Sequence, residues 1–136
     1  MLAFTTRIPL AVMIAMGIKQ WENRSAMPFP VCGRCAMTCS KSSDSREYAN
    51  FLAWAKQVFQ ADVYTALPQW EQVADWRGKL IAVCDYDASN IPGPQIWNEG
   101  YRVWWHLTNV QMLKKQIPCR GNVGMWELPL EITDVL

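Results

Sequence analysis

Histidine is the scarcest chemically active residue in this 136-residue sequence, which contains only His106. The five cysteines include one C-x-x-C spacing, Cys32 to Cys35, and no second pair that would complete the four ligands usual for structural zinc. An odd number of cysteines also argues against a secreted disulfide scaffold. We therefore expect cysteines packed in the core, with no metal, no cofactor and no disulfides, and we keep a metal or redox site as the alternative.

The net charge is also nearly zero, because the sequence has 13 basic and 12 acidic residues. Any attraction to nucleic acid must then come from a local basic patch. The longest apolar run, Ile8 to Met16, has about nine residues and is too short to span a bilayer. It follows Arg7 and imitates a signal peptide, but export would carry unpaired thiols into an oxidising compartment. We favour a buried helix, a cytoplasmic protein and no membrane partner.

The composition is that of one globular domain, with 51% hydrophobic residues and eight tryptophans that offer core packing or stacking surfaces. No internal repeat or heptad is visible. Hydrophobic periodicity and turn residues predict a small α+β domain built on a β-barrel with a few flanking helices. The predicted strands are Leu2–Thr6, Trp21–Ser25, Arg34–Ser40, Lys79–Tyr86, Tyr101–Val110 and Val123–Leu128, and the predicted helices are Ala11–Met16 and one capped by Asp44 that ends near Phe59.

One charged stretch stands out directly after the apolar run. Lys19, Glu22 and Arg24 lie within six positions, and an extended backbone projects Glu22 and Arg24 to the same face. Burying either charge alone would cost several kcal/mol, so they should pair with each other or with Lys19, Lys41 or Asp85. Solvated charges on an edge strand are the alternative interpretation.

Other short motifs accompany this stretch in a fixed order. They are Arg7-x-Pro9, Gly17-x-Lys19-x-x-Glu22-x-Arg24, Gly33-Arg34 running into Ser40-Lys41, Gly78 to Asp87, Trp105-x-Leu107-x-Asn109-Val110, Ile117-Pro118-Cys119-Arg120-Gly121 and Gly124-x-Trp126-Glu127. Together they resemble the signature of the ASCH domain, a member of the PUA-like barrel superfamily. The resemblance covers most of the chain and leaves out Pro68 to Trp76 and the loop around Pro92.

The resemblance implies a single ASCH-like domain over residues 1–136, with a PUA-like barrel and a cleft lined by the charged strand. It further implies a binding module for RNA, for other single-stranded nucleic acid or for a modified nucleotide. Lysine and arginine suit a phosphate, a carboxylate accepts from a base amino group, and tryptophan stacks on a base. The ligand-binding residues implied are Lys19, Glu22, Arg24, Ser40, Lys41, Asp85 and Trp126, with core packing as the alternative role for Trp126 and Trp105.

The alternative function is a small hydrolase, with Lys19 and Glu22 as its catalytic residues. Some relatives of the family are amidohydrolases that use the motif lysine, a threonine three residues on and a distant glutamate. In this sequence the position three residues after Lys19 is Glu22, so the hydroxyl is missing. Ribonuclease activity has also been attributed to relatives, and a protein-interaction role is a third hypothesis.

The motif makes a geometric prediction that the structure can test. We expect Glu22 and Arg24 to lie within ion-pair distance on one face of a strand, in a concave and partly exposed cleft, with Lys19 at its rim. We also expect a closed or nearly closed barrel whose end is covered by the Ala11–Met16 helix.

Overall fold

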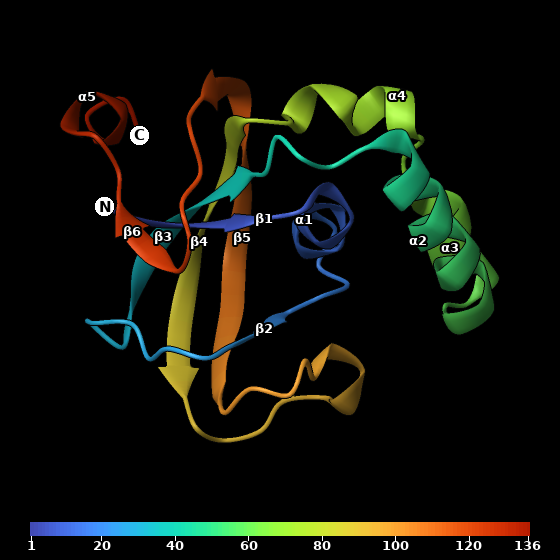
Figure 1. Ribbon diagram of the computed structural model, residues 1–136, viewed down its shortest axis with the longest axis horizontal. Coiled ribbons are helices and arrows are strands. Elements are labelled where there is room, and N and C mark those ends of the chain that lie inside the picture. The colour runs from blue at the N-terminus through green and yellow to red at the C-terminus, as the bar shows by residue number, and fades with distance from the viewer.

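Six strands form one curled sheet in the computed structural model, which describes residues 1–136 (Figure 1). The strand order is β2-β5-β4-β3-β1-β6, and only β1 and β3 run parallel. The predicted α+β barrel-type fold is confirmed, but the prediction of a closed or nearly closed barrel is wrong: the sheet is a half-barrel whose edge strands β2 and β6 do not pair with each other. The strands are β1 (Leu2–Thr6), β2 (Trp21–Arg24), β3 (Cys32–Cys39), β4 (Lys79–Ser89), β5 (Val103–Pro118) and β6 (Met125–Glu127).

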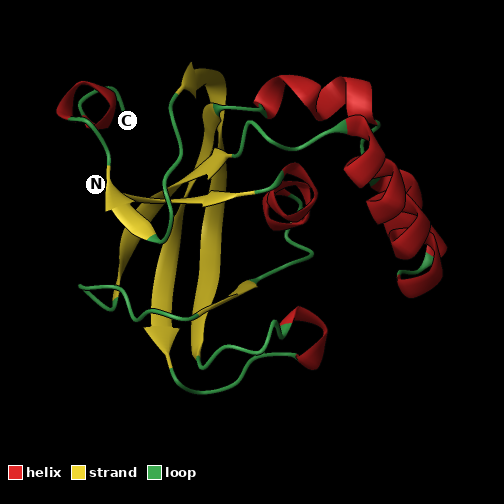
Figure 2. Cartoon of the chain, viewed as in Figure 1, coloured by secondary structure: helices red, strands yellow, loops and turns green.

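Helix α1 (Ile8–Ala15) lies in the core, between the sheet and the outer helices (Figures 1 and 2). Pro9 stands in its first turn, where its missing N–H costs no hydrogen bond. Gly17, at φ +75°, follows the last turn in the left-handed conformation typical of a helix end. Six of the eight helix residues are buried, so the expectation of a buried helix is confirmed. None of the helices combines the length and the apolar character needed to cross a bilayer.

The remaining helices sit at the periphery of the sheet (Figure 2). The side chain of Asp44 caps α2 (Ser45–Val58) by accepting from the Glu47 N–H at 2.8 Å, as the sequence predicts. Tyr48 anchors this layer, because its hydroxyl donates to the Pro68 carbonyl at 2.6 Å. The shorter helices are α3 (Ala61–Ala66), α4 (Trp70–Val73) and α5 (Leu130–Thr133), with 3-10 turns η1 (Ala74–Trp76) and η2 (Gln95–Trp97).

Strand β5 is longer than the Tyr101–Val110 segment that the sequence predicts. It continues to Pro118, although its pairing with β4 is interrupted by register shifts. Around Ile81 of β4, the partner positions on β5 jump from Ile117 to Met112. Such a bulge breaks the period-2 alternation, which is why the hydrophobic pattern ends too early.

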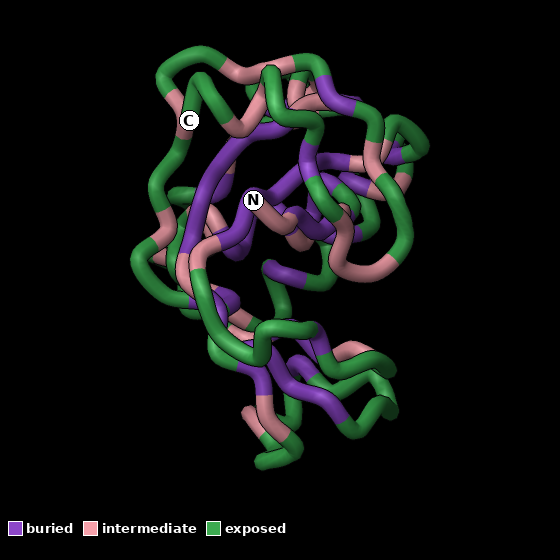
Figure 3. The backbone as a smooth tube through the Cα atoms, turned by 90° about the vertical axis from the view of Figure 1, so that its left-hand side faces the viewer, coloured by how far each residue is buried: buried purple, intermediate pink, exposed green.

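The core follows the strands and α1, which form most of the buried stretches in Figure 3. Cys35, Met37 and Cys39 are fully buried on β3, as expected, but Cys32 at the start of the strand is exposed, so the expectation of core packing is wrong for this cysteine. All five cysteines are free, and the Cys35 and Cys84 sulfurs lie 3.6 Å apart across β3 and β4. No three His, Cys, Asp or Glu side chains are grouped closely enough to hold a metal ion.

Candidate functional site

Glu22 is the centre of a buried charge cluster on β2. Its Oε1 accepts from Lys19 Nζ at 2.8 Å and its Oε2 from Arg24 Nε at 2.9 Å. The predicted pair of Glu22 and Arg24 on one face of the strand is therefore confirmed. Only 5% of the Glu22 side chain is exposed, so solvent screens these interactions weakly.

The prediction that Lys19 lies at the rim of the cleft is wrong. Its side chain is 2% exposed, donates to the Trp21 carbonyl as well as to Glu22, and lies 5.2 Å from the centre of the Trp97 ring. The chain turns back after α1, and the N–H groups of Ile18 and Lys19 both donate to the Met13 carbonyl. This turn directs Lys19 into the interior, which a strand-based interpretation of the motif could not foresee.

Arg24 spans the open side of the half-barrel. Its Nη2 donates to the Thr5 carbonyl on β1 at 3.1 Å, although β1 and β2 lie far apart in the strand order. The guanidinium also lies 5.8 Å from the centre of the Phe4 ring and 5.2 Å from that of Trp105. Cation–π contacts of this kind stabilise a guanidinium that has lost part of its hydration. The Arg24 side chain is 23% exposed, so it is still accessible from outside.

A cavity of about 520 Å³ opens beside Arg24, between β2 on one side and β1 and β6 on the other. We call it the seam cleft. Glu22 and Glu99 contribute carboxylates to it, and Trp105 forms part of its wall. The Trp105 ring is 1% exposed, and its buried Nε1 has no hydrogen-bond partner in the chain. The other lining residues are Leu2, Thr5, Thr6, Arg7, Leu10, Arg24, Ser25, Ala26, Met27, Pro28, Phe29, Tyr101, Val123, Gly124 and Met125.

Two aromatic side chains of the seam cleft are open to solvent. Phe29 is 92% exposed and Tyr101 is 49% exposed. Tyr101 is held through its backbone, because its N–H donates to Asn23 Oδ1 at 3.0 Å and its carbonyl accepts from Asn23 Nδ2 at 2.9 Å. Its ring is consequently a half-exposed apolar face on a fixed backbone.

A second cavity of about 570 Å³ adjoins the seam cleft and shares Arg24 with it. We call it the cation pocket, because four of its lining side chains are cationic and none is a carboxylate. The cations are Arg7, Arg24, Lys41 and Arg120, and the other lining residues are Thr5, Thr6, Ser40, Gly121, Asn122, Val123 and Gly124.

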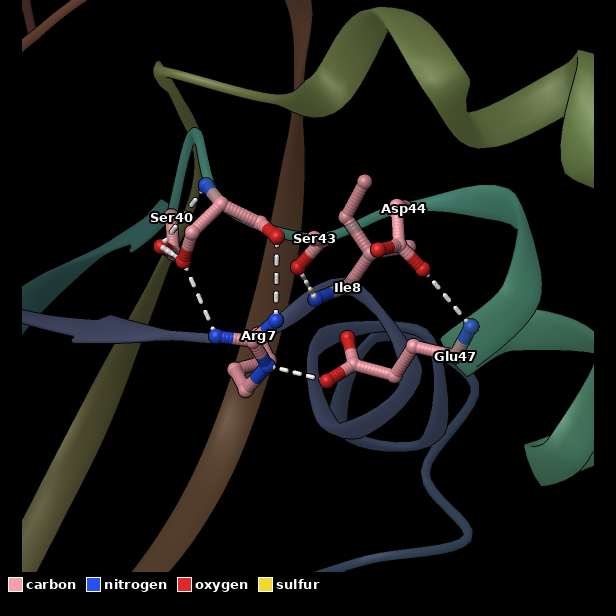
Figure 4. Close-up of polar contacts among 7 residues, drawn as sticks. Arg7, Ile8, Ser40, Ser43, Asp44 and Glu47 are labelled. Atoms are coloured by element: carbon pink, nitrogen blue, oxygen red, sulfur yellow. Dashed lines mark hydrogen bonds and ion pairs between the residues drawn. The ribbon is translucent and has the colours of Figure 1, made fainter.

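Arg7 is fixed between the two cavities at the start of α1 (Figure 4). Its Nε contacts Glu47 Oε2, its Nη1 donates to Ser42 Oγ at 2.9 Å, and its Nη2 donates to the Ser42 carbonyl at 3.0 Å. The neighbouring Ile8 N–H donates to Ser43 Oγ at 2.9 Å. These bonds tie β1 and α1 to α2 and to the segment that precedes it, which carries Ser40 and Lys41.

Thr5 organises the opposite wall through a hydrogen-bond relay. Its Oγ1 accepts from the Asn122 N–H at 3.0 Å and from Trp126 Nε1 at 3.3 Å. Thr38 donates to the Phe4 carbonyl at 3.2 Å, so in the 2.8 Å contact between the two threonine hydroxyls Thr5 is the donor. The relay fixes the loop that carries Arg120.

The structure brings together some of the predicted site residues and separates others. Ser40 and Lys41 line the cation pocket, whereas Asp85 and Trp126 line neither cavity. Asp85 instead pairs with Arg34 Nη1 at 3.0 Å across β3 and β4. Trp126 supports Thr5 through its indole N–H, so it positions the wall and offers no stacking face there.

The sequence-based prediction missed Arg7, Arg120 and Asn122 in the cation pocket, and Tyr101 in the seam cleft. Arg7 and Arg120 belong to motifs that carry the family resemblance, so these motifs held the missing signal. Tyr101 follows an irregular loop and has no motif around it. The lone histidine, His106, stacks on Trp21 with ring centres 4.2 Å apart and lines neither cavity.

The chain matches no protein-family model and no curated protein sequence.

Proposed function

We propose that the protein is a binding module for RNA, for other single-stranded nucleic acid or for a modified nucleotide, and that the seam cleft and the cation pocket form its binding site. The observation that carries the proposal is the direct connection between a cleft that holds two exposed aromatic rings and a pocket lined by four cations. A nucleotide has the same two parts, because a flat base is joined to an anionic phosphate.

The contacts available in each cavity fit this division. The Tyr101 ring offers a stacking face, and base–aromatic stacking contributes roughly 1–3 kcal/mol per base. The Glu99 carboxylate can accept from a base amino group. Arg24 donates through Nε and Nη2 within the chain, and no contact of its Nη1 is observed, so one donor group is left for a ligand. The weak net charge of the protein is compatible with binding, because four of its 13 basic residues line one pocket.

The buried position of Lys19 makes hydrolysis the weaker candidate function. Lys19 lines neither cavity and donates to Glu22 and to a backbone carbonyl. An amine placed in this way cannot reach a ligand in the seam cleft without breaking the ion pair. The arrangement supports binding by Arg24 and Tyr101 and supplies no nucleophile to the seam cleft from Lys19.

Fluorescence anisotropy with internally labelled single-stranded RNA tests the proposal. Tyr101→Ala should weaken binding about 5- to 150-fold, which corresponds to the loss of one stacked base. Arg24→Ala should weaken binding as well, and affinity should fall as salt rises. Arg102→Ala is the matched control, because Arg102 is the exposed neighbour of Tyr101 and lines neither cavity.

Urea unfolding of each variant separates a binding effect from a folding effect, since Arg24 also bonds to Thr5 and contacts two aromatic rings. If folded Tyr101→Ala and Arg24→Ala proteins bind a panel of RNAs and modified nucleosides as the parent does, the proposal is wrong.

A further inference from the structure

We infer that the cation pocket is a subsite for a phosphomonoester, the terminal phosphate of a nucleotide or of an oligonucleotide end. This inference rests on the proposed function, and it specifies which part of the ligand enters which cavity. The residues that carry it are Arg7, Lys41, Arg120 and Asn122, of which only Lys41 was expected from the sequence.

The balance of charge in the cation pocket points to a dianion. Arg7 is paired with Glu47 and Arg24 with Glu22, whereas Lys41 and Arg120 take part in none of the ion pairs of the chain. Two cations without a carboxylate therefore face the same cavity. A phosphomonoester carries a charge of about −1.5 to −2 at pH 7. A phosphodiester within a strand carries about one negative charge per phosphate, so it would leave one of the two cations uncompensated.

The positions of both unpaired cations are restricted by their surroundings. Arg120 begins a loop that closes tightly on β1, because a Cβ at Gly121 would lie 2.5 Å from Thr5 Cγ2. Asn122 holds the same loop through its N–H bond to Thr5 Oγ1. The Lys41 stem lies over Gly78, where an added Cβ would come within 2.8 Å of Lys41 Cε. A fixed backbone beside Arg120 and a packed stem at Lys41 lower part of the conformational entropy that binding an anion would cost.

The place of the cation pocket next to the seam cleft sets the orientation of the ligand. Arg24 lines both cavities, with Glu22 and Tyr101 on the side of the seam cleft and Lys41 and Arg120 on the other. A nucleotide would therefore place its base near Tyr101 and its terminal phosphate between Lys41 and Arg120. This arrangement distinguishes a phosphorylated ligand from a nucleoside, which has no group for the cation pocket.

The test compares four single-stranded RNA octamers of one sequence with an internal fluorophore: 5′-phosphorylated, 3′-phosphorylated, phosphorylated at both ends and unphosphorylated at both ends. At least one terminal phosphate should tighten binding about tenfold or more, as expected for charge-assisted hydrogen bonds to an anion. The comparison of 5′ and 3′ forms identifies the end that is bound. Inorganic phosphate should compete with the phosphorylated octamers only.

The variant Lys41→Ala/Arg120→Ala should lose the preference for a terminal phosphate, so that its affinities for the phosphorylated and unphosphorylated octamers become equal. Lys114→Ala/Lys115→Ala is the matched control, because it removes two exposed cations of β5 that line neither cavity. The control should keep the preference in full. Tyr101→Ala should weaken the binding of all four octamers.

Each contrary result identifies what failed. Equal binding of all four octamers, with sensitivity to Tyr101→Ala, would overturn the phosphomonoester subsite and leave the proposed function standing. A preference that persists in Lys41→Ala/Arg120→Ala would place the phosphate elsewhere and overturn the subsite as well. Absence of binding to any octamer and to the panel of modified nucleosides would refute the proposed function itself. A phosphoserine peptide that binds as tightly as the phosphorylated RNA would overturn the assignment to a nucleotide.

Discussion

The substitution Glu22→Gln tests whether the buried charge cluster holds the fold together. Gln keeps the shape of the side chain but removes the negative charge that faces both Lys19 and Arg24. Lys19 would then be a buried cation, 2% exposed, whose remaining acceptors are an amide oxygen and the Trp21 carbonyl. Breaking a buried pair by removing one partner costs about 3–5 kcal/mol. We expect a loss of about 3 kcal/mol, at the low end, because the amide oxygen still accepts one hydrogen bond.

Urea unfolding followed by tryptophan fluorescence measures this loss as a change in the free energy of unfolding. Lys19→Met and the double variant Lys19→Met/Glu22→Gln complete a double-mutant cycle. The double variant should be less destabilised than the sum of the single variants by at least about 1 kcal/mol, because it leaves no unpaired charge at Lys19. Asp85→Asn is the matched control, since its ion pair with Arg34 is partly exposed and should contribute less than about 1 kcal/mol. A loss below about 1 kcal/mol in Glu22→Gln, or a cycle additive within about 0.5 kcal/mol, would refute the reasoning.

Two further predictions follow from buried titratable groups. Burial raises the pKa of Tyr48 to about 12, from an ordinary value of 10.0. As pH rises, the unfolded chain therefore releases the phenol proton at a lower pH than the folded protein does. The free energy of unfolding should fall between pH 10 and pH 12 by up to about 1.4 kcal/mol per pH unit. Unfolding curves of the parent and Tyr48→Phe check this, and an equally steep fall in both would assign it to other groups. Cys32 is the one exposed thiol. Burial raises the pKa of Cys39 to about 12. A hydrogen bond to Cys84, together with burial, raises the pKa of Cys35. A thiol reagent should modify one cysteine quickly in the native protein and five cysteines after denaturation. The Cys32→Ser variant should lose the fast phase of labelling. Fast labelling of a second cysteine in the native protein would contradict this prediction.

Local sequence patterns were sufficient for the elements that depend on near neighbours. The Asp44 cap and the buried helix of the apolar run each depend on residues a few positions apart, and the structure has both. The pair of Glu22 and Arg24 was predictable for the same reason, because an extended backbone alone sets their common face.

Contacts between distant segments were outside the reach of such patterns. Lys19 turns inward because the chain after α1 folds back onto Met13, which no period along the sequence encodes. Asp85 lines neither cavity, because its carboxylate pairs with Arg34, which lies opposite it in the register of β3 and β4. The cation pocket combines Arg7, Lys41 and Arg120 from three separate segments, so only the curvature of the sheet brings them together.

The open side of the half-barrel explains why stability and binding meet at the same residues. An unpaired sheet edge exposes backbone donors and acceptors, and pairing β2 with the opposite edge would remove that liability. In this fold Arg24 takes over part of that task by donating to the Thr5 carbonyl from β2. Arg24 occupies part of the gap between β2 and β1, and the space beside it is the seam cleft. Glu22 forms ion pairs with both Arg24 and Lys19. The buried residues of this cluster, Lys19 and Glu22, therefore support the fold, while the partly exposed Arg24 faces the cavity. A substitution of Lys19 should therefore affect mainly the stability of the fold, whereas a substitution of Arg24 should affect both stability and ligand binding.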